Sequence, residues 1–376
     1  MSGPRIKVLQ IIKSLGRGGA ETLLVETLKL HDKNKFEFHY IYFLPWKDQL
    51  VGELRAHGGM VTCISASNNL HLLSRVWAIA RYVRANNIQI IHAHLPWAGI
   101  AARFVGRMTR VPVLYTEHNK QERYHFATRK LNLATMGWLS RLIPVSVDVE
   151  ESVRKYKRGI DAIVQTIPNG VNVDHFRPDE GHRHKVRNQL GIPIDAPVIM
   201  TIAVFRVQKR LDIWMEVAAK IIKSRPDAHF IIVGDGPLKE QLYQKRKELS
   251  LESVVHMVGL QTDVRPYLGS ADIFMISSVF EGLPIALLEA MSAALPVVST
   301  SAGGIKEVVR HEIEGLLCDV DTPFNLAEHA LWLMNNPHEA TTLGKASRNR
   351  VQNTFSMNRM VASLETLYHT FVSQPK

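Results

Sequence analysis

Short apolar segments alternate with helix-like segments along most of the chain, and this alternation limits the fold more than any other feature. The apolar segments have the length of buried strands, and the segments between them are rich in good helix formers. Alternating strands and helices predict a parallel sheet, in which ligands gather at the carboxyl ends of the strands. Strands are expected at residues 6–15, 36–44, 60–65, 88–95, 198–205, 228–237, 254–260 and 271–278, with one more directly before His118.

The length of the chain predicts two domains rather than one. With 376 residues, two domains of about 180 residues each are expected. A polar segment at residues 180–191 follows Pro178 and is typical of a hinge, which divides the chain near residue 185. Cys63 and Cys318 lie far apart in the sequence, so a reducing compartment is favoured over a disulfide scaffold.

Residues 277–289 carry the strongest indication of a ligand site. The expected strand at 271–278 leads into a loop with Glu281 and Gly282, and Pro284 suits the first turn of a following helix. The free backbone amides of that turn, from Gly282 to Ile285, would bind phosphate or another anion. Glu281 then precedes the helix and Glu289 lies in its second turn.

The spacing of these two glutamates fits a long polar ligand. Eight residues at helical rise separate the carboxylates by about 12 Å, which matches a nucleotide diphosphate sugar. Glu281 could accept hydrogen bonds from the sugar hydroxyls, and Glu289 could accept them from the ribose. Solvated acidic residues near a helix start have the same spacing and are common, and the spacing alone favours that second interpretation.

The same stretch resembles a known family. Residues 281–290, EGLPIALLEA, together with SAGGIKEVV at 301–309, resemble the E-x7-E signature of the retaining glycosyltransferases of family 4. The resemblance implies the α/β fold called GT-B, in which two Rossmann-like domains with parallel sheets face a cleft. Residues 1–185 would then bind the acceptor and residues 186–355 the nucleotide sugar. Residues 356–376 resemble the C-terminal helix that crosses back to the first domain.

The resemblance also implies a diphosphate-binding loop at residues 205–212, FRVQKRLD. Lys209 stands at the position of the family's phosphate-binding lysine. Val204 stands where the family has an arginine, and Arg206 is the candidate replacement. A side chain two places further along need not reach the same oxygens, so this departure puts the affinity for the diphosphate in question.

Further residues match the family one by one. Gly18 and Gly19 match a first loop that approaches the donor phosphate or the acceptor, Val258 matches the contact with the nucleobase, and His118 matches a histidine beside the reacting carbon. His92 and His94 also fall at expected strand ends, although a lone histidine is more often structural. The implied catalytic residues are His118, Glu281 and Lys209, and the implied donor-binding residues are Gly18, Gly19, Arg206, Lys209, Val258, Glu281, Gly282, Leu283, Pro284, Ile285 and Glu289.

The resemblance predicts transfer of a sugar with retention at its anomeric carbon, and without a cofactor or a metal ion. Lys209, Arg206 and the amides near Gly282 would stabilise the charge that develops on the departing diphosphate. The sequence offers no evident carboxylate nucleophile. The family resemblance favours a front-face path, in which the diphosphate takes the proton of the acceptor hydroxyl.

Charge is distributed unevenly between the two halves of the chain. Residues 1–185 contain 27 Lys and Arg against 15 Asp and Glu, whereas the remaining residues contain 19 against 20. The excess of basic residues in the first half predicts an anionic partner, either lipid head groups or nucleic acid. The alternative is a basic surface that is only exposed to solvent. Residues 122–144 mix basic, aromatic and apolar residues at helical intervals, so this segment could lie on a membrane or pack on the sheet.

The expected partners are a nucleotide-sugar donor and a glycan or lipid-linked acceptor in polysaccharide or lipopolysaccharide assembly, at the cytosolic face of the membrane. No segment of 18 apolar residues occurs, and the N-terminus lacks the pattern of a signal peptide. Another GT-B enzyme, such as a sugar phosphorylase or a nucleotide-sugar epimerase, remains an alternative. A nucleic-acid-binding protein is a more distant one, and no recognised nucleic-acid motif supports it.

Overall fold

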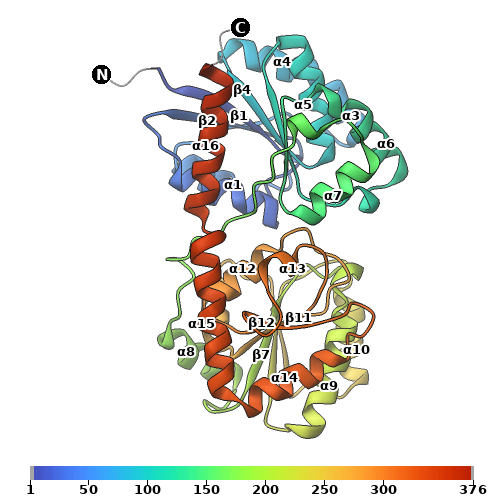
Figure 1. Cartoon of the computed structure of the whole chain (residues 1–376), viewed down its shortest axis with the longest axis vertical. Helices are drawn as coiled ribbons and strands as arrows, with labels where there is room; N and C mark the ends of the chain where they lie inside the picture. The colour runs from blue at the N-terminus through green and yellow to red at the C-terminus, as the bar shows by residue number, and fades with distance from the viewer. Residues whose placement is uncertain (1–3, 374–376) are drawn as a thin grey trace. The chain divides into compact units, whose positions relative to one another are not determined.

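The computed structural model describes residues 4–373, which form two compact units. Unit 1 comprises residues 4–169 and 357–373, and unit 2 comprises residues 170–356. Figure 1 shows that each unit is a sheet flanked by helices on both faces. The prediction of two Rossmann-like domains with parallel sheets is therefore confirmed.

Unit 1 is built on a six-stranded sheet in the order β3-β2-β1-β4-β5-β6, in which each neighbouring pair of strands is parallel. Its strands are β1 Ile6–Ile11, β2 Phe36–Tyr42, β3 Met60–Cys63, β4 Ile90–His94, β5 Val113–Glu117 and β6 Arg141–Pro144. Its helices are α1 Gly19–Leu30, α2 Val51–Ala56, α3 Asn69–Ser74, α4 Val76–Ala85, α5 Pro96–Thr109, α6 Phe126–Thr135, α7 Val147–Tyr156 and α16 Met357–Ser373, with 3₁₀ turns η1 Gln121–Arg123, η2 Met136–Trp138 and η3 Asp161–Ile163.

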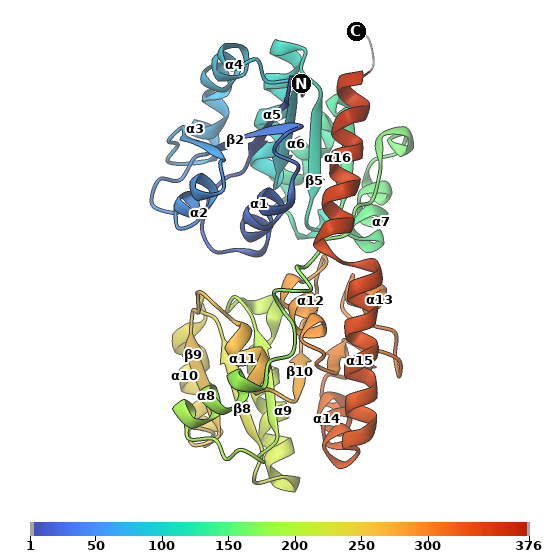
Figure 2. The same cartoon turned by 90° about the vertical axis from the view of Figure 1, so that its left-hand side faces the viewer.

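Alternation along the strands assigns the side chains of unit 1 to two hydrophobic cores. Leu9 and Ile11 pack with α3, α4 and α5 on one face of the sheet. Val8 and Ile12 belong to the opposite core, which contains residues of α1, α2 and α16. Successive residues of a strand point to opposite faces, so Gln10 shares the face of Val8 and α16. Figure 2 shows α1 and α16 on this face.

Unit 2 repeats this topology with the order β12-β11-β10-β7-β8-β9, again in parallel pairs. Counted from its first strand, the order is the same as in unit 1. Its strands are β7 Val198–Ile202, β8 His229–Val233, β9 Val255–Gly259, β10 Ile273–Ile276, β11 Val297–Thr300 and β12 Gly315–Cys318. Its helices are α8 Glu180–Leu190, α9 Leu211–Ser224, α10 Lys239–Glu248, α11 Arg265–Ser270, α12 Ile285–Ser292, α13 Ile305–Val308, α14 Asn325–Asn335 and α15 Pro337–Thr354, with the 3₁₀ turn η4 Val207–Lys209.

The strand order of each unit creates one topological switch point. In unit 1 the chain leaves the sheet in opposite directions from β1 and β4, and in unit 2 from β7 and β10. Ligands of open parallel sheets bind outside the carboxyl ends of the strands at such a point. The carboxyl ends of β7 and β10 are therefore where a ligand of unit 2 is expected.

The predicted hinge at residues 180–191 is wrong. These residues form helix α8, which packs on α11 in unit 2 (Figure 2). The side chain of Arg187 is fully buried and donates to the carbonyls of Ser270 and Ala196 and to the carboxylate of Asp272. The polar composition of this segment thus reflects structural hydrogen bonds rather than a solvated linker. The two units divide at residue 169 rather than near residue 185.

Two helix predictions in unit 1 also need correction. The basic residues 71–87, HLLSRVWAIARYVRANN, are typical of a single helix, whereas in the structure α3 ends at Ser74 and α4 begins at Val76. The segment 122–144 contains α6 and η2 but ends as strand β6, which pairs with β5. Four residues are too few for a periodicity to distinguish a strand from a helix, and β11 and β12 escaped prediction for the same reason.

Candidate functional site

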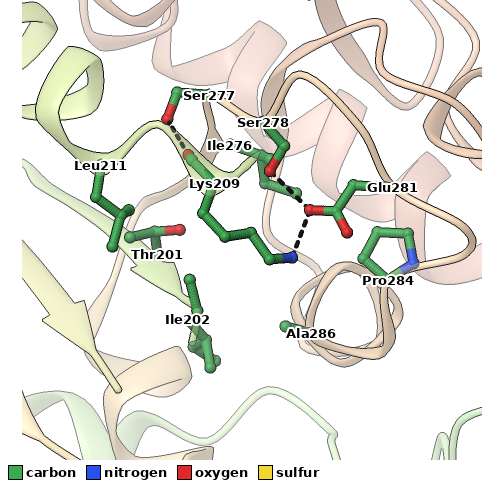
Figure 3. Close-up of a pocket in the computed structure, with 11 residues that line it drawn as sticks. Thr201, Ile202, Lys209, Leu211, Ile276, Ser277, Ser278, Glu281, Pro284 and Ala286 are labelled. Carbon is green, nitrogen blue, oxygen red and sulfur yellow. Dashed lines mark hydrogen bonds and ion pairs between the residues drawn. The ribbon is translucent and has the colours of Figure 1, made fainter. Parts of the chain in front are cut away.

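A small pocket lies at the switch point of unit 2 (Figure 3). It has a volume of about 20 Å³, which is room for about one water molecule. The carboxyl ends of β7 and β10 form one side of it, and the η4 loop and the start of α12 form the rest. The lining residues are Thr201, Ile202, Ala203, Lys209, Leu211, Ile276, Ser277, Ser278, Glu281, Pro284 and Ala286.

The centre of the pocket is an ion pair between two residues that the sequence singled out. Lys209 Nζ donates to Glu281 Oε1 at 2.5 Å, and Ser278 Oγ donates to the same oxygen at 2.7 Å. The side chains of Lys209 and Glu281 are 20% and 9% exposed. The pair therefore sits in a partly dehydrated site, where an electrostatic interaction is stronger than in water.

The loop that carries Lys209 is held by the loop after β10. Ser277 Oγ lies 2.9 Å from the carbonyl oxygens of both Lys209 and Arg210, and the Val279 amide donates to the Gln208 carbonyl at 2.9 Å. Arg210 adopts a φ of 47° and donates from Nη1 to the Val320 carbonyl. These contacts fix the backbone from which the Lys209 side chain reaches Glu281.

Two glycines after β8 allow a third segment to approach this loop. A side chain at Gly234 would overlap the Ala203 carbonyl, and φ of 135° at Gly234 favours glycine. A Cβ at Gly236 would lie 2.6 Å from the Phe205 amide nitrogen. The sequence Gly234-Asp235-Gly236-Pro237 is therefore required for close packing against residues 203–205, and not merely for a turn.

Helix α12 begins where the sequence predicted, with one difference. Pro284 is the N-cap residue rather than a helical residue, and no side chain caps the amides of the first turn. Gly282 and Leu283 lie in the preceding loop, Ile285 is the first helical residue, and Glu289 is half-buried in the second turn. The estimate of about 12 Å between the carboxylates assumed helical rise over all eight residues from Glu281 to Glu289. Because the helix begins only at Ile285, that assumption does not hold for residues 281–284.

The remaining donor-site candidates of unit 2 lie outside the pocket lining. Val204 is 42% exposed and Arg206 is also exposed, whereas Phe205 between them is buried. Val258 is in β9, and its carbonyl accepts a hydrogen bond from Gln261 Nε2 at 2.6 Å. The structure thus brings together Lys209, Glu281 and Pro284 in the pocket, and leaves Arg206, Val258 and Glu289 outside its lining.

Gly18, Gly19 and His118 belong to unit 1. Gly18 is the N-cap of α1 and Gly19 is its first residue, and residues 12–17 connect them to the carboxyl end of β1. A Cβ at Gly18 would overlap the carboxylate of Glu21, which accepts a hydrogen bond from Ser14 Oγ. Because that carboxylate is the movable end of a side chain, packing alone does not require glycine at position 18.

His118 follows β5 and faces a cluster of buried histidines. Its Nε2 lies 3.4 Å from Nδ1 of His94. His92 contacts Thr116 Oγ1 at 2.7 Å and the Tyr368 hydroxyl at 2.8 Å. Burial lowers the pKa of His118 to about 4 and that of His92 to about 3, and it lowers the pKa of His94 well below its ordinary value. All three rings are neutral at pH 7.

Several residues of these sites were missed from the sequence. Ser277 and Ser278 are a polar pair directly after the apolar strand β10, and this position alone could have marked them. Gln10 and Tyr368 carry no comparable signal, because Gln10 is a single residue within a buried strand and Tyr368 is one of several residues on the buried face of α16. Within residues 4–373, no cluster of three or more His, Cys, Asp and Glu could hold a metal ion.

Comparison with known proteins places almost the whole chain in recognised families. Residues 17–175 match the family described as Glycosyltransferase Family 4, and residues 182–350 match the family described as Glycosyl transferases group 1. An Escherichia coli relative named UDP-Gal:alpha-D-GlcNAc-diphosphoundecaprenol alpha-1,3-galactosyltransferase is 25% identical, and the match covers 97% of each chain. A Bacillus anthracis relative named N-acetyl-alpha-D-glucosaminyl L-malate synthase is 27% identical over 79% of each chain.

The fold is also that of solved structures. HepE of Anabaena, solved with UDP and glucose, superposes with a TM-score of 0.88 at 20% sequence identity. The match covers 97% of this chain and all of HepE. At this identity the likeness concerns the fold, which is GT-B.

Proposed function

The chain belongs to glycosyltransferase family 4, and from this premise we propose that it moves a sugar from a nucleotide diphosphate sugar to an acceptor hydroxyl with retention. It is a glycosyltransferase of class EC 2.4. The observation that carries the proposal is the ion pair of Lys209 and Glu281 at the switch point of unit 2. A cation and a hydrogen-bond acceptor side by side suit the two adjacent parts of a nucleotide sugar, its diphosphate and its sugar.

In this proposal the diphosphate competes with Glu281 for Lys209. The lysine ammonium neutralises the diphosphate, and the uncapped amides at the start of α12 add partial positive charge. Glu281 then accepts hydrogen bonds from sugar hydroxyls, and Ser278 keeps its carboxylate oriented. Arg206 assists at the diphosphate, Glu289 holds the ribose, and the backbone at Val258 meets the nucleobase.

The chemical step needs no metal ion and no cofactor. The bond between the anomeric carbon and the diphosphate oxygen breaks as the acceptor oxygen bonds to the same face of the sugar. The acceptor proton passes to the departing diphosphate oxygen, whose charge Lys209 stabilises. Glu281 is a poor nucleophile here, because its Oε1 already accepts from both Lys209 and Ser278.

A thermal-shift panel tests the donor site. UDP, GDP, ADP and their common sugars are compared, each with and without EDTA. One base should raise the melting temperature regardless of EDTA, and Lys209→Met should abolish the shift. Lys245→Met is the matched control, since Lys245 forms an ion pair with Glu216 on the same unit. No shift with any nucleotide would contradict the proposed site, and an inverted product anomer by NMR would contradict retention.

We further propose that the acceptor is carried on a lipid in polysaccharide or lipopolysaccharide assembly. The Escherichia coli relative, whose name specifies a diphosphoundecaprenol acceptor, supports this substrate class. The Bacillus anthracis relative is named for malate, so a small soluble acceptor is the competing outcome. Labelled sugar that partitions into butanol with the lipid extract would favour the lipid, and transfer to malate would overturn it.

The surface of unit 1 supports contact with an anionic membrane. Residues 54–116 contain seven arginines and no Asp or Glu, and they include α3, α4 and α5. Helices α3, α4 and α6 all pack against α5 and form one outer layer. On α4, Trp77 and Arg81 are one turn apart and both exposed, and Leu70 of α3 is exposed as well. Exposed aromatic and apolar side chains among arginines are typical of a surface that rests on anionic head groups.

Vesicle sedimentation tests this contact at the proposed cytosolic membrane face. Vesicles with phosphatidylglycerol should bind the protein and release it at high salt, whereas pure phosphatidylcholine should not bind it. The double variant Leu70→Ser/Trp77→Ser should bind more weakly. Trp332→Ser, which removes an exposed tryptophan from unit 2, should bind like the native chain. Equal binding to both kinds of vesicle would contradict the proposal.

Within residues 4–373, no helix is long and apolar enough to span a bilayer.

A further inference from the structure

Six buried or half-buried side chains form a continuous chain of hydrogen bonds at the carboxyl end of the unit 1 sheet. They come from β1, β4 and β5 and from α16, which is the last helix of the sequence. In order along the network they are Thr116, His92, Tyr368, Gln10, His94 and His118. The network ends at His118, which the family resemblance sets beside the reacting carbon, so its meaning rests on the function proposed above.

In each hydrogen bond of the network, either of the two side chains can be the donor. Gln10 is the residue that decides, because its amide group has one end that donates and one that accepts. Its nitrogen lies 3.2 Å from the Tyr368 hydroxyl, and its oxygen lies 2.8 Å from His94 Nε2. If the amide were turned over, an O–H···O bond would have to span 3.2 Å, which exceeds the usual range for that bond but not for N–H···O. The distances therefore favour the amide as described.

This orientation fixes the protons on the two histidines that follow. Gln10 Oε1 accepts, so His94 must carry its proton on Nε2. The ring of His94 is neutral, since burial keeps its pKa low, and its Nδ1 is then an acceptor. The partner of that nitrogen is His118 Nε2 at 3.4 Å, which is a long contact. A proton on His118 Nε2 makes this contact a weak hydrogen bond, whereas two unprotonated nitrogens would set their lone pairs against each other. His118 is left with an unprotonated Nδ1.

The opposite end of the network is consistent with the same direction. The Tyr368 hydroxyl accepts from the Gln10 amide and therefore gives its own proton to His92 Nδ1 at 2.8 Å. His92 then donates from Nε2 to Thr116 Oγ1 at 2.7 Å. Each of the five contacts then pairs one donor with one acceptor, as expected for buried polar groups.

We propose that Gln10 and Tyr368 are positioning residues that hold His118 in the tautomer with its proton on Nε2, so that Nδ1 accepts a hydrogen bond from a substrate hydroxyl. His118 in this form cannot donate from Nδ1 to the departing diphosphate. Its role is to orient a hydroxyl of the sugar or of the acceptor. The last helix of the chain thus acts on the reaction through three intervening side chains.

Nitrogen NMR of the histidine rings tests the tautomer directly. The full-length protein is labelled with ¹⁵N-histidine, and the signals of residue 118 are identified by their loss in His118→Asn. In the native protein at pH 7.5, His118 should show a protonated Nε2 and an unprotonated Nδ1. A native His118 with its proton on Nδ1, or on both nitrogens, would overturn the proposal.

Two nearly isosteric variants test the positioning residues. In Gln10→Met the His94 proton loses its acceptor, so it should move to Nδ1 and donate to His118 Nε2, and the His118 tautomer should reverse. In Tyr368→Phe the Gln10 amide loses its anchor, and His118 should show both tautomers. Tyr82→Phe is the control, because it removes a hydroxyl 2.9 Å from Nδ1 of the buried His39 without touching the network.

Turnover separates a tautomer effect from a structural one. With UDP-glucose and UDP-galactose as probes, kcat should fall about tenfold or more in Gln10→Met and less in Tyr368→Phe, and Tyr82→Phe should match the native rate. The Kd for UDP, which lacks the transferred sugar, should stay within about twofold in all three variants. An unchanged His118 spectrum in Gln10→Met, or an equal loss of turnover in Tyr82→Phe, would refute the proposal. If the native protein shows the predicted His118 spectrum but transfers no sugar, the proposed tautomer is supported and the proposed function is contradicted.

Discussion

The ion pair at the centre of the pocket makes a prediction that separates stability from binding. Replacing Lys209 by methionine keeps the length of the side chain and removes its charge. Glu281 would then keep a carboxylate that is 9% exposed, with the Ser278 hydroxyl still donating to it. A buried charge that loses its partner is costly, so unit 2 should become less stable.

The size of this loss follows from burial. Breaking a fully buried pair costs about 3–5 kcal/mol, and the 20% exposure of Lys209 reduces this to roughly 2 kcal/mol. For a domain of this size the melting temperature should fall by about 4–8 °C. Lys245 and Glu216 form an ion pair of the same 2.5 Å length in unit 2, but their side chains are 29% and 32% exposed. Lys245→Met should therefore cost at most about 1 kcal/mol.

The double variant Lys209→Met/Glu281→Gln completes the cycle. Removing the isolated carboxylate should restore about half of the lost stability, because the remaining amide has a smaller cost of burial. Affinity for the nucleotide should not recover. A lost charge-assisted contact of about 1.5–3 kcal/mol corresponds to a Kd that is roughly 10- to 150-fold weaker.

Calorimetry provides both measurements, with scanning for stability and titration for nucleotide affinity. Equal melting temperatures for Lys209→Met and Lys245→Met would show that burial of the pair does not matter. If the double variant is no more stable than Lys209→Met, the unpaired carboxylate of Glu281 is not the cause of the lost stability. Either result would refute the reasoning from the pocket.

Three further predictions concern pH, the missing arginine and a glycine. The pKa of His92 is about 3 in the folded protein and about 6.5 when unfolded. The contribution of neutral His92 to stability is therefore complete above pH 6.5 and is lost as the pH falls toward 3. The melting temperature should fall less steeply with pH over this range in His92→Gln than in the native protein. Val204→Arg should tighten nucleotide binding up to about tenfold in titrations and offset the loss in Arg206→Ala, whereas no gain would mean that the position does not reach the diphosphate. Gly236→Ala should lower stability by about 1–3 kcal/mol in denaturant unfolding, because its Cβ would lie 2.6 Å from the Phe205 nitrogen, and a neutral result would contradict that close contact.

Local sequence patterns determined much of this protein. Apolar runs of strand length between helix-like segments predicted two parallel sheets, and the structure has them. Glu281 and Lys209 were identified from short motifs, and the start of α12 was placed within one residue. These features are local, because a strand end, a glycine turn or a helix start is encoded by neighbouring residues.

Only the tertiary structure decided which distant residues meet. Lys209 and Glu281 are 72 positions apart, and they contact each other because β7 and β10 are neighbours in the sheet. Tyr368 and His92 are 276 positions apart, and no pattern around Tyr368 distinguishes it from the apolar residues of α16. Strand order and the packing of the last helix set these contacts, and both result from burying apolar faces of the whole chain rather than from any local preference. The sequence therefore named most of the groups, and the fold determined how their charges and protons are shared.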